Sequence, residues 1–362
     1  MVCAVAIKEE GIGFMKNYLE KYSSNTLQDS YCMIREGAAI LDGSEFCMMK
    51  ISGDGAADCL DQAATKDIQY LNIDTVSECL ILNEQATALG IAYICRLDED
   101  FIVLTPPGSE KAARRIMNAA DGKALVTDMK TDHNMIFIEG PKSYAVVRDV
   151  LNVDVEMLPL RGIQVIPDWQ GHEIIVMRIG RSGEYAYNVI TDSECMSEIA
   201  AQIMTYGKDN DIKLGVASEE AMTVCMLETL EPDFRKLPAE DYDLFTLGIQ
   251  WMIQYEKENY CGHDALMELF GRERNEESVC FKANERNSVE VGADVKFGGD
   301  VVGKVIQTAY SPAQSCAVGT ILLRKDLAVS GIILEACDKD GSFSIETVSY
   351  PITRPISWDI QI

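Results

Sequence analysis

The pattern of apolar residues changes along the chain, and this change limits the folds that the chain can adopt. Up to about residue 270, segments typical of helices and strands alternate, whereas short apolar runs typical of strands dominate afterwards. The charge-rich stretch FGRERNEESV separates the two patterns. We therefore predict a domain boundary near residue 276. A mixed region at 1–276, which we expect to contain two subdomains, precedes a small β-barrel or sandwich at 277–362.

Length and charge narrow the functional class. The 362 residues exceed one average domain, and 47% of them are apolar, which suffices for more than one core. The formal net charge of −26 would repel nucleic acids and anionic membrane surfaces. No apolar run approaches the roughly 18 residues that span a bilayer, and the N-terminal MVCAVAIKEEG becomes acidic too early for a secretory signal. We expect a cytoplasmic globular protein that binds neither nucleic acid nor membrane.

Several common catalytic and metal-binding patterns are missing from the sequence. The 12 cysteines form no CxxC pair and no cluster with histidine, so no zinc or iron–sulfur site is predicted. The three histidines lie far apart without a nucleophile motif beside them. No GxGxxG loop and no GxxxxGKS or GxxxxGKT loop follows a strand. We therefore expect no metal centre, no Ser-His-Asp or Cys-His catalysis and no phosphate-binding loop.

One polar interruption stands between two apolar runs. The run EIIVM is followed by RIGRSG and then by YAYNVI, which predicts two strands joined as a hairpin. Glu184 lies at the mouth of this hairpin, beside Tyr185 and Tyr187. Taken alone, the segment favours a solvated turn glutamate next to two half-buried strand tyrosines.

Four motifs in the same order resemble the glycine-cleavage T-protein (aminomethyltransferase) and the related folate-dependent demethylases. IFIEGPKS resembles that family's apolar strand ending in Gly-Pro, and RSGEYAYNV resembles its Tyr-Thr-Gly-Glu-x-Gly-Tyr/Phe-Glu hairpin. LGIQWMIQYEKENYCGHDAL is similar to a segment with a Trp, an acidic loop and an Ile-Gly-Arg-Glu-Ala-Leu helix start, and VGKVIQTAYSPAQSCAVGTILL resembles the barrel's Ser-Pro turn and the following strand. These matches cover most of residues 30–355 and imply an α+β, T-protein-like multi-domain folate-binding fold with a C-terminal β-barrel.

The resemblance also implies residues that bind tetrahydrofolate. In the family, the glutamate of the hairpin grips the pterin ring, and the resemblance carries this role to Glu184. A carboxylate can accept two parallel hydrogen bonds from the N–H and amino edge of a pterin. The family's Arg-Asp-x-Leu-Arg-Leu-Glu helix corresponds here to MTVCMLE, so an arginine expected near the folate tail is missing. Arg178, Arg181 and Arg235 are candidates to replace it, although each is also explained as an ordinary surface residue.

The catalytic residues of the family are altered. Its Gly-Gly-x-x-Asp-Asp pattern corresponds to a stretch in which Gly90 and Ile91 replace the two aspartates. Glu84 is the nearest carboxylate, with a solvated turn residue as the simpler interpretation. Tyr185 and Tyr187 are candidate proton donors, since a phenol stays protonated near neutral pH. Packed strand tyrosines are the simpler interpretation of both.

Two classes of function remain open. The first is an enzyme that moves a one-carbon unit, most simply a methyl group, to N5 of tetrahydrofolate. Its donor would be a small methylated compound or a methyl-carrier protein, such as a corrinoid protein. The second is a catalytically inactive folate-binding regulatory or accessory protein. Loss of the aspartate is compatible with both, because direct methyl displacement depends chiefly on alignment and needs an acid only at the leaving group.

Overall fold

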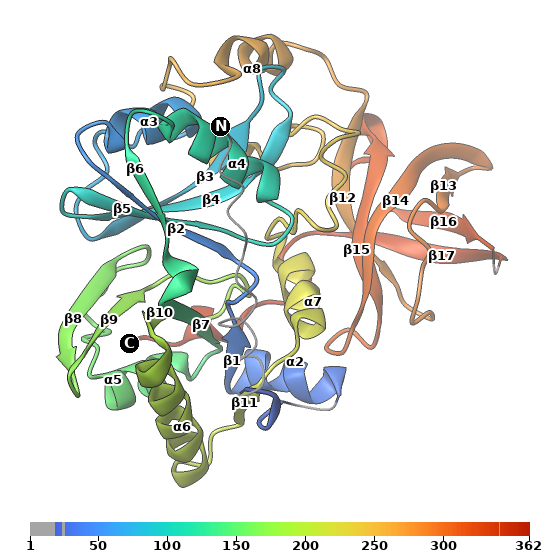
Figure 1. Cartoon of the computed structure of the whole chain (residues 1–362). Helices are drawn as coiled ribbons and strands as arrows, with labels where there is room; N and C mark the ends of the chain where they lie inside the picture. The colour runs from blue at the N-terminus through green and yellow to red at the C-terminus, as the bar shows by residue number, and fades with distance from the viewer. Residues whose placement is uncertain (1–18, 24–25, 340) are drawn as a thin grey trace.

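The computed structural model describes residues 19–23, 26–339 and 341–362, which form two open sheets and one closed barrel (Figure 1). The first sheet has six strands in the order β11-β1-β7-β10-β9-β8. These strands are β1 (Ala38–Asp42), β7 (His133–Glu139), β8 (Ile163–Trp169), β9 (His172–Met177), β10 (Ala186–Asp192) and β11 (Leu214–Val216). Only β1 and β11 pair in parallel, and the other neighbours in this sheet are antiparallel.

Helices α5 (Ser143–Leu151) and α6 (Ser193–Asp209) cover one face of the first sheet. Helix α6 begins after Asp192, whose side chain accepts hydrogen bonds from the backbone N–H groups of Glu194 and Cys195. Apolar residues of both helices pack against alternate strand residues such as Ile136 and Val189. Successive strand residues point to opposite faces, so the intervening residues are directed to the other side of the sheet.

The second sheet is antiparallel and has five strands in the order β3-β4-β5-β2-β6. These are β2 (Cys47–Ser52), β3 (Thr75–Leu82), β4 (Ala88–Leu97), β5 (Asp100–Thr105) and β6 (Leu125–Asp128). Helices α3 (Ala56–Ala63) and α4 (Glu110–Ala120) cover one face of this sheet. The other face shares a core with the first sheet, in which Leu80 and Tyr93 join Phe137 and Ile190.

A closed barrel of six strands follows helix α8 (His263–Phe270). Its strands, in the order β12-β15-β14-β13-β16-β17, are β12 (Glu276–Ala283), β13 (Asp294–Phe297), β14 (Asp300–Ser311), β15 (Cys316–Arg324), β16 (Ile333–Asp338) and β17 (Gly341–Val348). Phe281, Val305 and Ile321 lie in its core. The predicted α+β fold class with a C-terminal β-barrel is therefore confirmed.

Two helices and the C-terminal tail connect the first sheet with the barrel. Helix α2 (Leu27–Glu36) packs against α7 (Glu219–Thr229), and α7 in turn contacts β14 (Figure 1). Beyond the barrel, the chain returns to the first sheet, where Ile362 packs against the core beneath α5 and α6. The first sheet, α7, the barrel and the tail thus meet around one region.

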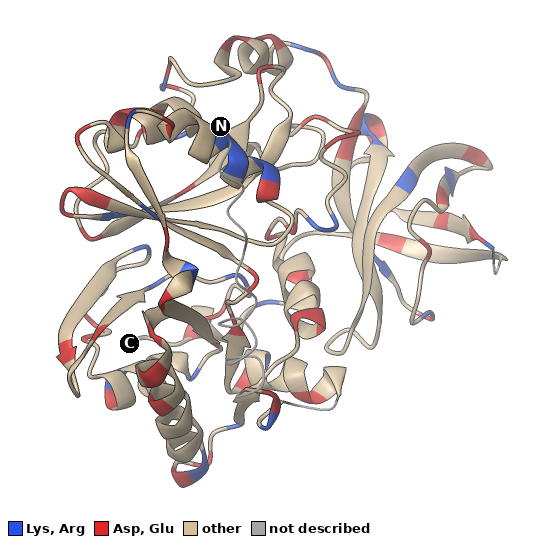
Figure 2. Cartoon of the chain, in the orientation of Figure 1, with Lys and Arg blue, Asp and Glu red and all other residues tan. Residues whose placement is uncertain are grey.

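The charges are distributed unevenly along the chain. Figure 2 shows acidic residues on the helices of both sheets and on the barrel, and basic residues on α4. The sequence of α4 contains Lys111, Arg114 and Arg115. An anionic ligand would therefore need a local basic lining. Among the described residues, no helix combines the length and the apolar character needed to cross a membrane.

Candidate functional site

The predicted hairpin is present, with a longer connection than a tight turn. Strands β9 and β10 pair antiparallel, with Asn188 opposite Met177, and residues 178–185 connect them. Glu184 lies in this connection, directly before the tyrosine that leads into β10. The sequence pattern therefore located both strands correctly.

Glu184 is buried and fully engaged by other parts of the chain. Its residue is 7% exposed, and its carboxylate accepts hydrogen bonds from Arg35 at 3.2 Å, from the backbone N–H of Ile356 at 3.1 Å, and from Ser357. Ser357 donates twice, through its N–H at 2.9 Å and its hydroxyl at 2.6 Å. Glu184 is therefore not a solvated turn residue. Its carboxylate binds the C-terminal tail to the connection before β10 through these hydrogen bonds.

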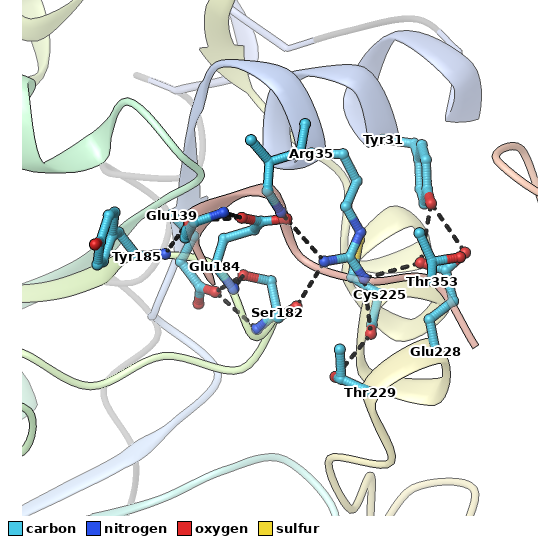
Figure 3. Close-up of polar contacts among 12 residues, drawn as sticks. Tyr31, Arg35, Glu139, Ser182, Glu184, Tyr185, Cys225, Glu228, Thr229 and Thr353 are labelled. Atoms are coloured by element: carbon cyan, nitrogen blue, oxygen red, sulfur yellow. Dashed lines mark hydrogen bonds and ion pairs between the residues drawn. The ribbon is translucent and has the colours of Figure 1, made fainter. Parts of the chain in front are cut away.

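Arg35 lies between two buried carboxylates (Figure 3). Its guanidinium donates to Glu184 and, at 2.8 Å, to Glu228 of α7. Glu228 also accepts from the hydroxyls of Tyr31 at 2.9 Å and Ser311 at 2.6 Å. This network joins α2, α7, β14 and the tail. Sequence reasoning missed Arg35, although an arginine directly after Ile34 on a helix face that also carries Tyr31 is an unusual core pattern.

The three arginines that were predicted for the folate tail lie in different environments. Arg181 is 3% exposed, pairs with both oxygens of Glu219 at 3.0 and 3.2 Å, and packs against the Phe46 and Phe137 rings. Arg178 donates to a backbone carbonyl in the segment before β8, at 2.8 Å.

Arg235 shares Glu219 with Arg181, at 3.3 Å, and binds Asp233 through two contacts of 2.8 Å. Burial would raise the pKa of the Glu219 carboxyl, but the two arginines hold this pKa below its usual value. The structure therefore brings Arg181 and Arg235 together on one carboxylate and places Arg178 elsewhere.

Both candidate tyrosines face the core beneath α5 and α6. The Tyr185 hydroxyl donates to the backbone carbonyl of Ile360, and its ring lies 5.9 Å from that of Tyr144. Tyr187 is fully buried, and burial raises the pKa of its phenol to about 12. Its hydroxyl has no hydrogen-bond partner among the described residues. Neither phenol is directed to the face of the first sheet that meets the second sheet.

Asn188 is directed to the opposite face of β10. Its ladder partners Phe137 and Met177 and its neighbour Ile190 all belong to the core shared with the second sheet. Asn188 is 0% exposed, and neither its side-chain oxygen nor its nitrogen has a partner in the described part of the chain. Buried amides are nearly always hydrogen-bonded, so this one is a candidate ligand contact. The sequence signal was a single amide inside the apolar run of β10.

The two positions that the sequence resemblance matches to the family's aspartates carry no acid. Ile91 is 1% exposed in the core between the two sheets. Gly90 has φ +149, and a Cβ there would lie 2.5 Å from Cβ of Ser109. Glu84 lies in the exposed turn between β3 and β4 and pairs with Arg115 at 2.7 Å. Backbone hydrogen bonding, and then Arg115, lower the pKa of the Glu84 carboxyl.

A cavity of about 850 Å³ lies between the segment after α7 and the barrel. Its lining includes Glu231, Asp233, Arg235, Lys236, Gln250, Trp251, Gln307, Thr308, Thr320 and Tyr350. The side-chain oxygens of Gln250 and Thr308 are buried and have no partner among the described residues. Of the residues predicted for the site, Arg235 alone lines this cavity. The cavity therefore has a mixed apolar and polar lining that contains unsatisfied polar atoms, and it is formed by segments far apart in the sequence.

A carboxyl pair lies at the same cavity. Glu231 follows α7 and lines the cavity, and Glu78 lies on β3. Glu78 is 8% exposed and accepts from Arg161 at 2.7 Å. Burial raises the pKa of Glu231 well above its usual value, and the charge of Glu78 raises it further. Sequence reasoning missed both residues, because nothing in either local segment indicates that they meet.

One group of possible metal ligands occurs in the described residues. Ligand atoms of His172, Asp192 and Cys195 lie within 4.8 Å of one another. One carboxylate oxygen of Asp192 contacts His172 Nδ1 at 2.6 Å, and the other caps α6. These contacts account for the cluster without an ion.

Comparisons with known proteins identify the family of the chain and proteins of similar fold. Residues 4–257 match the family model described as the GCVT N-terminal domain. An aminomethyltransferase of Halothermothrix orenii is 20% identical over 325 residues, which cover 88% of this chain and 89% of that protein. An aminomethyltransferase of Clostridium botulinum is 21% identical over 306 residues, covering 82% and 81%. Among solved structures, the glycine cleavage system aminomethyltransferase T from Bartonella henselae matches with a TM-score of 0.79 and 19% identity, covering 91% of this chain and 90% of that one.

Proposed function

Because the chain belongs to the family of the GCVT N-terminal domain, we propose that it is a tetrahydrofolate-dependent transferase of one-carbon units. The proposed unit is a methyl group, taken from a small methylated donor or from a methyl-carrier protein, of which a corrinoid protein is one kind. Reduced folate would supply the nucleophilic nitrogen N5, while the chain supplies binding, alignment and protons.

The polar residues in the lining of this cavity carry the proposal. A volume of about 850 Å³ lies within the usual range for cofactor sites. Arg235 and Lys236 suit the carboxylates of a glutamyl tail. The unpartnered oxygens of Gln250 and Thr308 suit the N–H and amino groups of a pterin. The residues present therefore fit a reduced folate, which would satisfy polar atoms that the chain itself leaves unpaired.

A pterin bound at the first sheet would instead meet Glu184 or Asn188, neither of which lines the cavity. The role that the resemblance implies for Glu184 requires the tail to release its carboxylate, because Ile356 and Ser357 already donate to its two oxygens. Asn188 offers an acceptor and a donor without that competition.

The residues that the sequence suggested for proton transfer do not line the cavity. The Tyr185 hydroxyl already donates to Ile360, and Tyr187 packs beneath α5 and α6. Glu84 is exposed and paired with Arg115. Direct methyl displacement requires chiefly that donor, carbon and acceptor be aligned, so the proposed activity does not depend on these three residues.

A titration and a product assay test the proposal. We expect calorimetry to detect binding of tetrahydrofolate, and a screen of N-methyl, O-methyl and S-methyl donors to yield methyltetrahydrofolate. Failure to bind tetrahydrofolate would contradict the proposal. Binding without transfer from any donor or carrier would favour the alternative, a catalytically inactive folate-binding regulatory protein. The observation behind that alternative is the apolar side chain of Ile91 at a family acid position.

A further inference from the structure

Arg235 and Lys236 both line the cavity, but they differ in the contacts that they make. Nε and one terminal nitrogen of Arg235 donate to the two carboxylate oxygens of Asp233, at 2.8 Å each. The other terminal nitrogen of Arg235 donates to Glu219 at 3.3 Å. Lys236 is exposed and forms no ion pair with any residue in the described part of the chain. Lys236 is therefore the cation of the lining that is available to a ligand.

A turn at Asp233 fixes where Lys236 leaves the backbone. The buried carboxylate of Asp233 accepts the backbone N–H of Arg235 at 3.0 Å. The backbone carbonyl of Asp233 accepts the N–H of Lys236 at 2.9 Å. The loop before α4 packs closely against this turn, because a Cβ at Gly108 would lie only 2.5 Å from the backbone nitrogen of Arg235. The turn therefore presents Lys236 at a fixed point of the cavity wall.

The acids of the lining do not neutralise Lys236. Asp233 is occupied by Arg235. Burial, and then the charge of Glu78, raise the pKa of the Glu231 carboxyl well above its usual value, which favours its neutral form. Lys236 thus gives the cavity a local positive charge, in a chain whose formal net charge is −26. Such a charge attracts an anionic group at short range, whereas the whole molecule repels polyanions.

We propose that Lys236 anchors a glutamyl carboxylate of a reduced folate, and that the site takes a folate with one glutamate rather than a polyglutamate chain. The inference rests on the proposed function, because it assigns a partner to the tail of the proposed ligand. An ammonium group donates charge-assisted hydrogen bonds to a carboxylate. Each further glutamate would add a negative charge, for which the described lining residues offer no second unpaired cation. Arg235 stabilises the turn that carries Lys236 and does not itself bind the ligand.

A ligand whose carboxylates are blocked tests the anchor. We expect the wild type to bind tetrahydrofolate about tenfold more tightly than its diamide, in which amides replace both glutamyl carboxylates, a factor near the lower limit for a hydrogen bond to a charged group. Lys236→Gln should bind the two compounds equally. The matched control is Lys208→Gln on α6, an exposed lysine outside the cavity lining, which should keep the wild-type preference. Calorimetry measures these affinities. A Lys236→Gln protein that keeps the preference, or a wild type that lacks it, would overturn the proposal.

Arg235 distinguishes an anchor from a structural cation. Arg235→Gln leaves the buried carboxylate of Asp233 without its ion-pair partner and should lower the denaturation midpoint. Lys236→Gln should leave the midpoint unchanged, since Lys236 is exposed. A folded Arg235→Gln protein should still prefer tetrahydrofolate to the diamide. If Arg235→Gln loses this preference and Lys236→Gln keeps it, Arg235 is the anchor and the proposal is wrong.

The number of glutamates provides the last measurement. The wild type should bind tetrahydrofolate triglutamate no more tightly than the monoglutamate, because the added carboxylates meet no free cation in the lining. Tighter binding of the triglutamate would contradict the preference for one glutamate. Absence of tetrahydrofolate binding in the wild type would refute the proposed function and this inference with it. Binding that does not depend on Lys236 would refute the inference alone.

Discussion

A single carboxylate, that of Glu184, holds the C-terminal tail against the first sheet. Both oxygens are occupied by backbone or side-chain donors of the tail, and Arg35 binds one of them. Because such a group is buried among donors, replacing it with an amide would set an N–H donor against other donors. The position is therefore as important for folding as for any contact with a ligand.

We predict that Glu184→Gln lowers the free energy of unfolding by about 3–5 kcal/mol, the range for breaking a buried ion pair. Chemical denaturation measures this change. Calorimetry of the folded variant with tetrahydrofolate separates the two roles. A stable variant with weakened binding would show that the carboxylate serves the pterin rather than the tail.

Asn188 allows a contrasting prediction. Asn188→Leu removes two unsatisfied buried atoms and should raise the free energy of unfolding by about 1–3 kcal/mol, the usual cost of such atoms. If the amide binds the pterin, the same variant should lose affinity for tetrahydrofolate. Denaturation and calorimetry on one preparation measure both effects. Unchanged affinity would remove Asn188 from the ligand site.

At the scale of elements, the packing of strand β4 leaves little room for an acid at positions 90 and 91, where the resemblance predicts that one was lost. Gly90 is in a backbone conformation that side chains rarely adopt, and Ser109, at the start of α4, closes the space beside it. Ile91 packs in the core between the two sheets. A carboxylate at either position would lack the contacts that orient a catalytic acid.

We predict that neither Gly90→Asp nor Ile91→Asp creates aminomethyl transfer from the lipoyl carrier protein of glycine cleavage, and that the wild type has negligible activity in the same assay. Gly90→Asp should also be destabilised, because its Cβ would come 2.5 Å from Cβ of Ser109. A carrier-dependent aminomethyl transfer assay and a thermal melt provide the measurements. Wild-type transfer at the rate of a glycine-cleavage aminomethyltransferase would contradict the prediction.

At the scale of the whole molecule, the cavity forms where three segments that are distant in the sequence meet. The segment after α7, residues 247–251 and the barrel strands each contribute one wall. Trp251 is 47% exposed in this lining, whereas Trp358, 58% exposed, lies in the tail beside the contacts of Glu184. These two tryptophans can therefore report which region a ligand occupies.

We predict that tetrahydrofolate changes the intrinsic fluorescence of the protein and that Trp251→Phe abolishes most of this change. Trp358→Phe is the matched control and should preserve it, because this residue is outside the cavity lining. Fluorescence titration of the three proteins provides the measurement. A signal that depends on Trp358 instead would place the ligand at the tail and at Glu184.

The sequence by itself determined the α+β class, the C-terminal barrel, the β9–β10 hairpin and the family. These features depend on local periodicity, on turn residues and on the order of short motifs, which neighbouring residues specify. That Gly90 and Ile91 replace acids stays a prediction from the resemblance. Arg235 was the one candidate from the sequence that the structure places at the cavity.

Only the tertiary structure decided which polar groups meet. Arg35 and Glu184 are separated by 149 positions and Tyr31 and Glu228 by 197, so no local pattern could pair them. The same holds for Glu78 and Glu231, because the effect of Glu78 on the pKa of Glu231 depends on packing of β3 against the segment after α7. Burial, which shifts a pKa and leaves an amide such as Asn188 unpaired, is likewise a property of the assembled sheets. Long-range packing therefore determines which polar groups meet at the site, whereas the local sequence pattern was sufficient to predict the fold.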